Sequence, residues 1–108
     1  MVKFSANLGF LWADIPLPAA ILAAKSAGFD AVECHWPYDT AATEIVKALD
    51  DTGLAMLGIN TFKGDDKGGG FGLSAVPGQQ AAARLAIDQA IFFAAQIGAE
   101  AVHVMAGK

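Results

Sequence analysis

Four polar side chains stand near the ends of runs that are otherwise apolar: Asn7, His35, Asn60 and His103. A polar group buried in such a place without a partner costs about 1–3 kcal/mol. Amide and imidazole groups can instead hydrogen-bond a small polar substrate. Two interpretations therefore stay open for each residue, a substrate contact or a structural residue whose hydrogen bonds are satisfied on the rim of the fold. His35 could also turn outward beside Trp36.

A carboxylate lies close to this set. Glu33 stands two positions before His35, so the alternation of a strand places both side chains on one face. A buried carboxylate with a raised pKa would suit acid–base chemistry. The favoured interpretation is structural, an ion pair with a basic residue of a neighbouring strand, for which Lys3 is the candidate.

The elements that position these residues alternate between strands and helices. The expected strands are residues 3–8, 31–36, 55–61 and a last one from Ala101. Each helix is predicted to begin at a proline or a capping residue and to end at a glycine. The first begins at Pro18 and ends before Gly28, the second is capped by Asp39 or Thr40 and ends at Gly53, and the third covers residues 79–97 before Gly98.

This repeated strand–helix unit predicts an α/β fold with a parallel sheet and right-handed crossovers. The unit builds either a closed (β/α)8 TIM barrel or an open doubly wound sheet. An open dinucleotide-binding sheet needs Gly-x-Gly-x-x-Gly after its first strand, and residues 8–12 read Leu-Gly-Phe-Leu-Trp. The missing fingerprint favours the barrel, of which residues 1–108 would supply four strands and three helices as a single half-barrel.

The last strand-like run reaches Lys108 with no helix after it. A strand left bare exposes apolar side chains and unpaired backbone groups. We therefore expect the chain to be part of a larger barrel. Made alone, it should be a homo-oligomer or self-associate through its two open edges.

Composition excludes several classes of protein. The chain has 108 residues, 55% of them hydrophobic, and a net charge of −4, so it is not disordered. Its seven basic residues are scattered, which argues against a nucleic-acid partner. No run reaches the roughly 18 apolar residues of a membrane helix, and the N-terminus does not read as a signal peptide, so a cytoplasmic location is expected. Cys34 is the single cysteine, which excludes an intrachain disulfide and a thiolate zinc cluster.

A long glycine-rich loop is expected over residues 63–78. Its glycines would permit a close approach to a ligand or a lid movement, and a solvated surface loop is the alternative. The loop does not match a nucleotide P-loop. Asp65 with Asp66 is a weak metal signal because no further ligand stands nearby in the sequence.

Several motifs occur together in order along the chain. They are residues 4–8 (Phe-Ser-Ala-Asn-Leu), 27–33 (Ala-Gly-Phe-Asp-Ala-Val-Glu), 37–39 (Pro-Tyr-Asp), 60–61 (Asn-Thr), 64–65 (Gly-Asp), 72–75 (Gly-Leu-Ser-Ala), 77–78 (Pro-Gly) and 102–107 (Val-His-Val-Met-Ala-Gly). This set resembles the hydroxypyruvate isomerase family within the xylose-isomerase-like TIM barrels. The loop segment and the His-Val-Met-Ala-Gly ending carry most of the specificity.

The resemblance implies a complete eight-stranded barrel that interconverts hydroxypyruvate and tartronate semialdehyde, or isomerises related 2-oxo acids. Two glutamates would move the proton through an enediolate, and a divalent cation, Mg²⁺ or Mn²⁺, would hold the substrate oxygens. These glutamates and the metal ligands would lie beyond Lys108, so no catalytic residue and no metal ligand is assigned here. The chain would be the N-terminal half of the barrel.

The resemblance also implies which residues face the substrate. Asn7, Asn60 and His103 would line the substrate side of the barrel mouth, with His35 nearby, and Phe10 and Trp12 would form an apolar wall. His35 and Trp36 depart from the family pattern, which often has two apolar residues there, and the run Gly68-Gly69-Gly70 is richer in glycine than usual.

Other functions within the superfamily remain open. A 2-oxo-tetronate isomerase and a sugar 3-epimerase use the same barrel, and the chain alone could be an inactive, self-associating half-barrel. A metal-dependent DNA-repair endonuclease is disfavoured because Asn60 stands where such an enzyme should offer a histidine, and because the chain is acidic.

Overall fold

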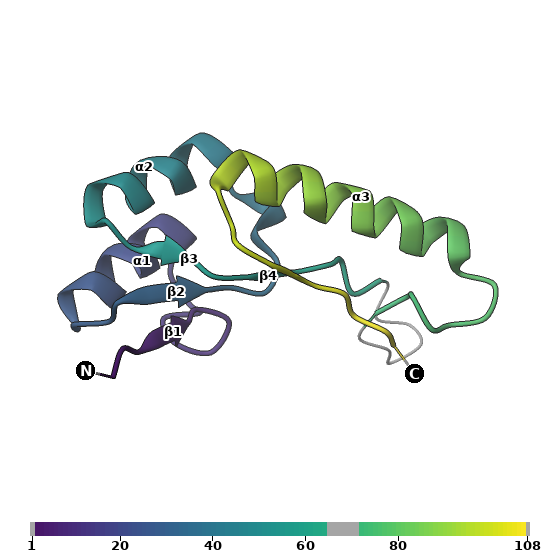
Figure 1. The fold of residues 1–108 in the computed structure, drawn as a ribbon, viewed down its shortest axis with the longest axis horizontal. Helices are drawn as coiled ribbons and strands as arrows, with labels where there is room; N and C mark the ends of the chain where they lie inside the picture. The colour runs from purple at the N-terminus through teal and green to yellow at the C-terminus, as the bar shows by residue number, and fades with distance from the viewer. Residues whose placement is uncertain (1, 65–71, 108) are drawn as a thin grey trace.

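The computed structural model describes residues 2–64 and 72–107, so Asp65, Asp66 and the run of three glycines lie outside the described residues. Short strands and helices follow one another along the described chain, and two of the strands are consecutive (Figure 1). The strands are β1 (Ser5–Asn7), β2 (Ala31–Glu33), β3 (Ala55–Met56), β4 (Ile59–Asn60) and β5 (Val102–His103). The helices are α1 (Leu17–Ser26), α2 (Ala42–Thr52) and α3 (Gln80–Ile97), with a single 3-10 turn η1 (Pro37–Asp39).

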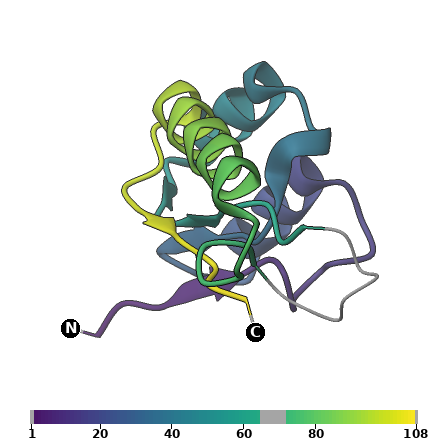
Figure 2. The same cartoon turned by 90° about the vertical axis from the view of Figure 1, so that its right-hand side faces the viewer.

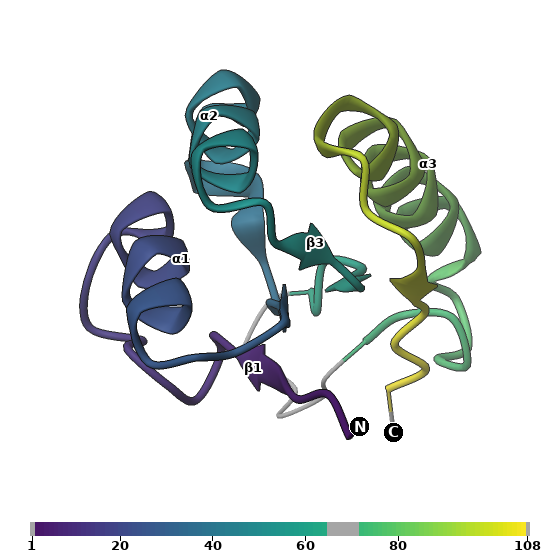
Figure 3. The same cartoon turned by 60° about the vertical axis from the view of Figure 1, so that its left-hand side comes forward.

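All the strand pairs are parallel, as the alternating pattern predicts. β1 pairs with β2 and β2 with β3, while β4 pairs with β5. The three helices form an arc on one side of the strands, and the two ends of the chain lie on the other side (Figure 3). The radius of gyration is 14.4 Å, above the about 13 Å of a compact domain of roughly 100 residues. The chain is therefore more extended than a compact domain of this length.

The strand expected over residues 55–61 is present but interrupted. Regular pairing from Val32 and Met56 would direct the N–H of Cys34 to the carbonyl of Leu57. That N–H instead donates to the Gly58 carbonyl at 3.1 Å, so the strand carries one extra residue. This is a β-bulge, and it divides the strand into β3 and β4. The expectation of one regular strand was wrong at this point.

The core lies between the strands and the arc of helices. Its largest fully buried side chains are Ile21, Val32, Ile45, Met56 and Ile59. On α3 the buried face is almost wholly alanine, at positions 83, 86, 90 and 94, before Ile97. These positions recur at helical spacing, and their small side chains let the helix approach the strands closely.

Most of the helix ends lie close to where the sequence predicts them. Gly53 and Gly98 cap α2 and α3 in the left-handed conformation, with φ of 71° and 72°. The predicted caps at Asp39 and Thr40 were wrong, because the N-cap of α2 is Ala41 and it makes no side-chain capping bond. Pro37 begins a 3-10 turn instead, which the Thr40 N–H closes by donating to the Pro37 carbonyl at 3.1 Å.

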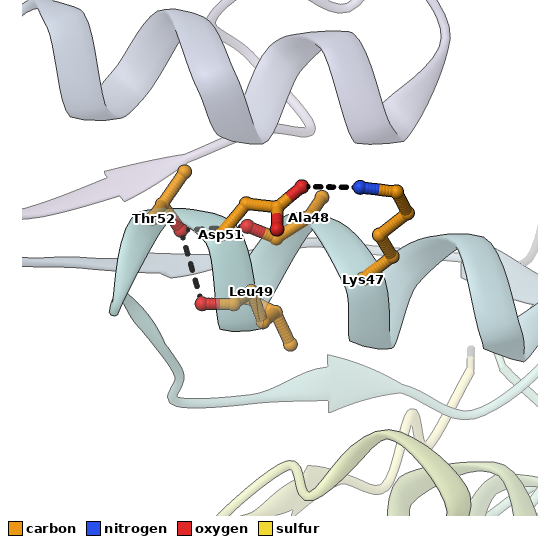
Figure 4. Close-up of polar contacts among 5 residues, drawn as sticks. All are labelled: Lys47, Ala48, Leu49, Asp51 and Thr52. Atoms are coloured by element: carbon orange, nitrogen blue, oxygen red, sulfur yellow. Dashed lines mark hydrogen bonds and ion pairs between the residues drawn. The ribbon is translucent and has the colours of Figure 1, made fainter.

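Hydrogen bonds from Thr52 stabilise the C-terminal turn of α2 (Figure 4). Its buried hydroxyl donates toward the carbonyls of Ala48 at 2.8 Å and Leu49 at 3.2 Å. The ion pair between Lys47 and Asp51 on the same helix is 2.7 Å long but largely exposed, so solvent screens it. The end of α2 is therefore held by its buried hydroxyl rather than by its charges.

The segment before α3 attaches to the last strand (Figure 2). The N–H of Leu73 donates to the Met105 carbonyl at 3.1 Å, and that of Ala75 donates to the Ala106 carbonyl at 2.8 Å. Gly72 forms an antiparallel bridge with Ala106, and a Cβ at Gly72 would lie 2.2 Å from the Met105 oxygen. This close approach requires glycine. The described end of the loop is thus anchored beside the carboxyl ends of the strands.

Cys34 is buried at the carboxyl end of β2, and this burial raises the pKa of its thiol. Desolvation, with a smaller contribution from the charge of Glu33, raises the pKa of the thiol from 9.0 to about 12. The native state therefore keeps a proton that the unfolded chain loses above pH 9. Stability should accordingly fall as the pH rises from about 9 to 12.

We predict that the free energy of unfolding is about 1 kcal/mol lower at pH 9.5 than at pH 8, mostly because of this thiol. Urea unfolding at the two pH values measures the difference. Cys34→Ala is the matched control. In this variant the free energy of unfolding should change much less between the two pH values. An equal decrease in that variant would contradict the assignment.

Candidate functional site

One cavity of about 440 Å³ brings the predicted site residues together. Asn7, His35, Asn60 and His103 all line it, although they come from four different positions along the chain. The lining also includes Glu33, Cys34, Leu57, Gly58, Ile59, Ala101 and Val102. The sequence predicts these four residues as substrate contacts; that role stays a prediction, and the structure shows that all four line one cavity.

The bulge in the third strand explains how Asn60 reaches the cavity. Met56 and Ile59 are both fully buried in the core although they are three residues apart, a spacing that regular alternation does not allow. The extra residue resets the alternation between them. Asn60, which follows the buried Ile59, lies among the residues that line the cavity, together with Leu57, Gly58 and Ile59.

Asn7 uses one end of its amide to shape the turn after β1. Its Oδ1 accepts a hydrogen bond from the N–H of Gly9 at 2.9 Å. The Nδ2 group is then the end that can donate to a ligand. Because β1 and β2 pair Asn7 with Glu33, the two side chains enter the cavity at the same level.

The ring of His35 lies against the backbone of Gly9. A Cβ built on Gly9 would stand 2.2 to 2.5 Å from three atoms of the imidazole, so no side chain fits there while the ring is in place. Phe10 meets the ring edge-on at 4.9 Å and Trp36 at 5.2 Å between centroids. The ring is half-buried and held on three sides, and it does not turn away into solvent.

Hydrogen bonds hold the strand ends around the cavity in register. The indole Nε1 of Trp36 donates to the Thr61 carbonyl at 3.1 Å, and the Tyr38 hydroxyl donates to the Asn60 carbonyl. The buried hydroxyl of Thr61 accepts the N–H of Met105 at 2.9 Å. These contacts link the ends of β2, β4 and β5. The Lys63 ammonium lies 4.9 Å from the Trp36 ring centre and covers the outer side of this wall.

Tyr38 is half-buried beside these strand ends. Burial, with a smaller effect of the neighbouring Cys34, raises the pKa of its phenol from 10.0 to about 12. The hydroxyl therefore remains a hydrogen-bond donor across the ordinary pH range.

The predicted pairing of Glu33 with Lys3 was wrong. Among the described residues no ion pair joins them, and the Glu33 carboxylate accepts a hydrogen bond from the Ser5 hydroxyl at 3.5 Å. Glu33 and His35, which the strand alternation places on one face, both line the cavity, as does Cys34 between them. A carboxylate therefore joins the amides and imidazoles of the site.

A second, smaller cavity of about 250 Å³ adjoins the first. Cys34 and His35 line both cavities. Apart from these, the second cavity is lined mostly by apolar side chains, among them Leu8, Trp12, Ile15, Leu17, Trp36 and Pro37. Trp12 thus forms part of an apolar wall, whereas Phe10 is 77% exposed and contacts His35 from outside.

The described residues offer no group of three histidine, cysteine, aspartate or glutamate side chains that could hold a metal ion. Glu33, His35 and His103 line one cavity without forming such a group. Within the same part of the chain, no helix has the length and apolar character needed to cross a membrane.

The contact between Gly9 and His35 makes a direct prediction. Gly9→Ala should lower the free energy of unfolding by about 1–3 kcal/mol because the new methyl group overlaps the imidazole. In a His35→Ala background the same change should cost much less, since the ring is gone. Urea unfolding of the unmodified chain, the two single variants and the double variant measures the coupling energy between Gly9 and His35.

Gly58→Ala is the matched control, because the added Cβ there would meet only the Ala101 oxygen at 3.7 Å. Equal costs for Gly9→Ala in the two backgrounds would show that the ring does not rest on Gly9.

Known proteins with the same sequence pattern have been described. A family profile described as "Xylose isomerase-like TIM barrel" matches residues 21–108. A human protein named "Putative hydroxypyruvate isomerase" is 44% identical over 108 residues, which are 99% of this chain and 39% of that protein. A 2-oxo-tetronate isomerase of Haemophilus influenzae is 41% identical over 105 residues, 97% of this chain and 41% of its own length.

A solved structure has the same fold. The crystal structure of an AP endonuclease, family 2, from Brucella melitensis superposes with a TM-score of 0.89 at 31% identity, over 99% of this chain and 42% of that one. The chain therefore spans about two fifths of the length of the proteins that it matches. Its parallel strands, its arc of helices and these matches agree, and the chain belongs to the xylose isomerase-like TIM barrel family.

Proposed function

We propose that this chain forms the substrate-binding wall of an isomerase that acts on a short hydroxylated 2-oxo acid, hydroxypyruvate in the first place. One observation carries the proposal: amides from Asn7 and Asn60, imidazoles from His35 and His103 and the Glu33 carboxylate line a single cavity. Relatives over the whole chain are named for hydroxypyruvate and 2-oxo-tetronate, and both are small polar acids.

The reaction moves hydrogen between adjacent carbons, so the substrate must be held as an enediolate while a proton leaves and returns. The amide and imidazole donors would bind the hydroxyl and carbonyl oxygens on which the negative charge develops. Two glutamates beyond this chain would transfer the proton. A Mg²⁺ or Mn²⁺ ion expected in the complete enzyme finds no ligand group among the residues described here, so no step is assigned to it.

Two alternatives act on related substrates. A 2-oxo-tetronate isomerase would use the same cavity for an acid one carbon longer, and a sugar 3-epimerase would bind a neutral ketose in it. The Brucella protein is named an AP endonuclease, but this chain carries a net charge of −4 and offers Asn60 rather than a histidine at the third strand. We therefore propose a small-molecule substrate and no nucleic-acid partner. A cytoplasmic location without a membrane partner is proposed as well.

We also propose that residues 1–108, as one N-terminal barrel half, self-associate when made alone. Paired strands end at β1 on one side and at β5 on the other. Next to these edges Phe4 is 64% exposed and Val104 is 45% exposed. An unpaired strand edge with apolar side chains favours pairing with a second chain.

Binding of hydroxypyruvate to the chain, measured by isothermal titration calorimetry, tests the function. Asn60→Ala and His103→Ala should each weaken binding about three- to tenfold, because each removes a hydrogen bond worth about 0.5–1.5 kcal/mol. Gln96→Ala on the exposed surface of α3 is the control. Saturable binding of fructose without binding of hydroxypyruvate would favour the epimerase instead.

Light scattering over a range of concentrations tests the self-association. We expect a mass above that of one chain, and we expect Phe4→Lys with Val104→Lys to reduce it, because a charge on an edge strand opposes pairing. Leu22→Lys on α1, where the leucine is 50% exposed, should leave the mass unchanged. A monodisperse monomer of the unmodified chain would overturn this proposal.

A further inference from the structure

We propose that His35 is the specificity residue of the site, and that its ring forms the partition that restricts the substrate to a short polar acid. The inference rests on the proposed function and names the feature that limits the length of the substrate. Its basis is the position of one imidazole between two adjoining cavities that are lined by different side chains.

The two cavities differ in what they can hold. The larger one has polar groups from Asn7, Glu33, Asn60 and His103 in its lining. The smaller one is surrounded mainly by aliphatic and indole side chains, with Thr40 as a further polar residue. A small oxo acid suits the first, and an apolar chain suits the second.

His35 stands where the two meet. Of the two residues that line both cavities, Cys34 is buried in the strand, with 6% of its surface exposed. The imidazole of His35 is the larger group and rests flat on Gly9, which itself lines the smaller cavity. The ring therefore lies in the gap between the two cavities, against the turn that follows β1.

The ring is also fixed in this position. Gly9 leaves it no room to move inward against the turn, and Phe10 and Trp36 hold it from two further sides. A side chain held by packing on several sides discriminates between substrates better than a mobile one, because displacing it has a cost. A substrate with an apolar tail would have to displace this ring to enter the smaller cavity.

Two ligands with the same charge test the partition. Hydroxypyruvate is short and polar, whereas 2-oxohexanoate carries the same 2-oxo acid group on an apolar tail. Calorimetric titration of the unmodified chain should give a dissociation constant at least tenfold lower for hydroxypyruvate. His35→Ala and His35→Ser, which both remove the ring, should reduce this preference at least tenfold, mainly by tighter binding of 2-oxohexanoate.

His35→Gln is the matched control, because a long polar side chain still fills the gap; it should keep the preference within threefold. Circular dichroism identifies the variants that fold, and either ring-removing variant is sufficient for the test. An unchanged preference in a folded ring-removing variant overturns the partition and leaves the proposed function in place. Equal binding of both acids by the unmodified chain would also overturn the partition and leave the proposed function in place. Failure of the unmodified chain to bind either acid overturns the partition together with the proposed function.

Discussion

Parallel pairing of the strands, with helices on one side only, is the constraint on which the rest of the structure depends. Because every strand runs in the same direction, all the carboxyl ends meet at one edge. The residues near those ends come from distant parts of the sequence, yet they line one cavity. The helices cover the opposite face, where the alanines of α3 allow close packing against the strands. The polar groups are thereby left to the inner side.

Within that frame, local departures from regularity decide what the cavity contains. The extra residue at the bulge lets Met56 and Ile59 both enter the core and still brings Asn60 to the cavity. Gly9 has a comparable effect through its missing side chain, since it gives the His35 ring a place to lie. Both are backbone features, and each sets the position of a side chain that could bind a substrate.

Much of the fold can be read from the sequence because its signals are local. A glycine after a helical pattern ends α2 and α3 where it is expected, and apolar runs locate the strands. The meeting of Asn7, His35, Asn60 and His103 follows from the rule that parallel strands share one functional edge. Membership of the barrel family, expected from the motifs, is confirmed by the matched profile.

What the sequence does not reveal depends on contacts between strands. The one mark of the bulge in residues 55–61 is Gly58, and a glycine alone does not fix the register of a strand. Glu33 was assigned to Lys3, whereas its hydrogen-bond partner is Ser5, two residues before Asn7, with which Glu33 pairs across β1 and β2. Ala41 replaces the expected caps because Pro37 starts a separate turn. The dependence of His35 on Gly9 joins two residues that only the fold brings together.

The central claim is that the cavity at the strand ends binds a short 2-oxo acid. A crystal structure of the chain grown with saturating hydroxypyruvate tests it most directly. The account predicts density for the acid within hydrogen-bonding distance of Asn60 and His103, with the His35 ring still resting on Gly9. Hydroxypyruvate bound elsewhere, with this cavity holding only solvent, would contradict it.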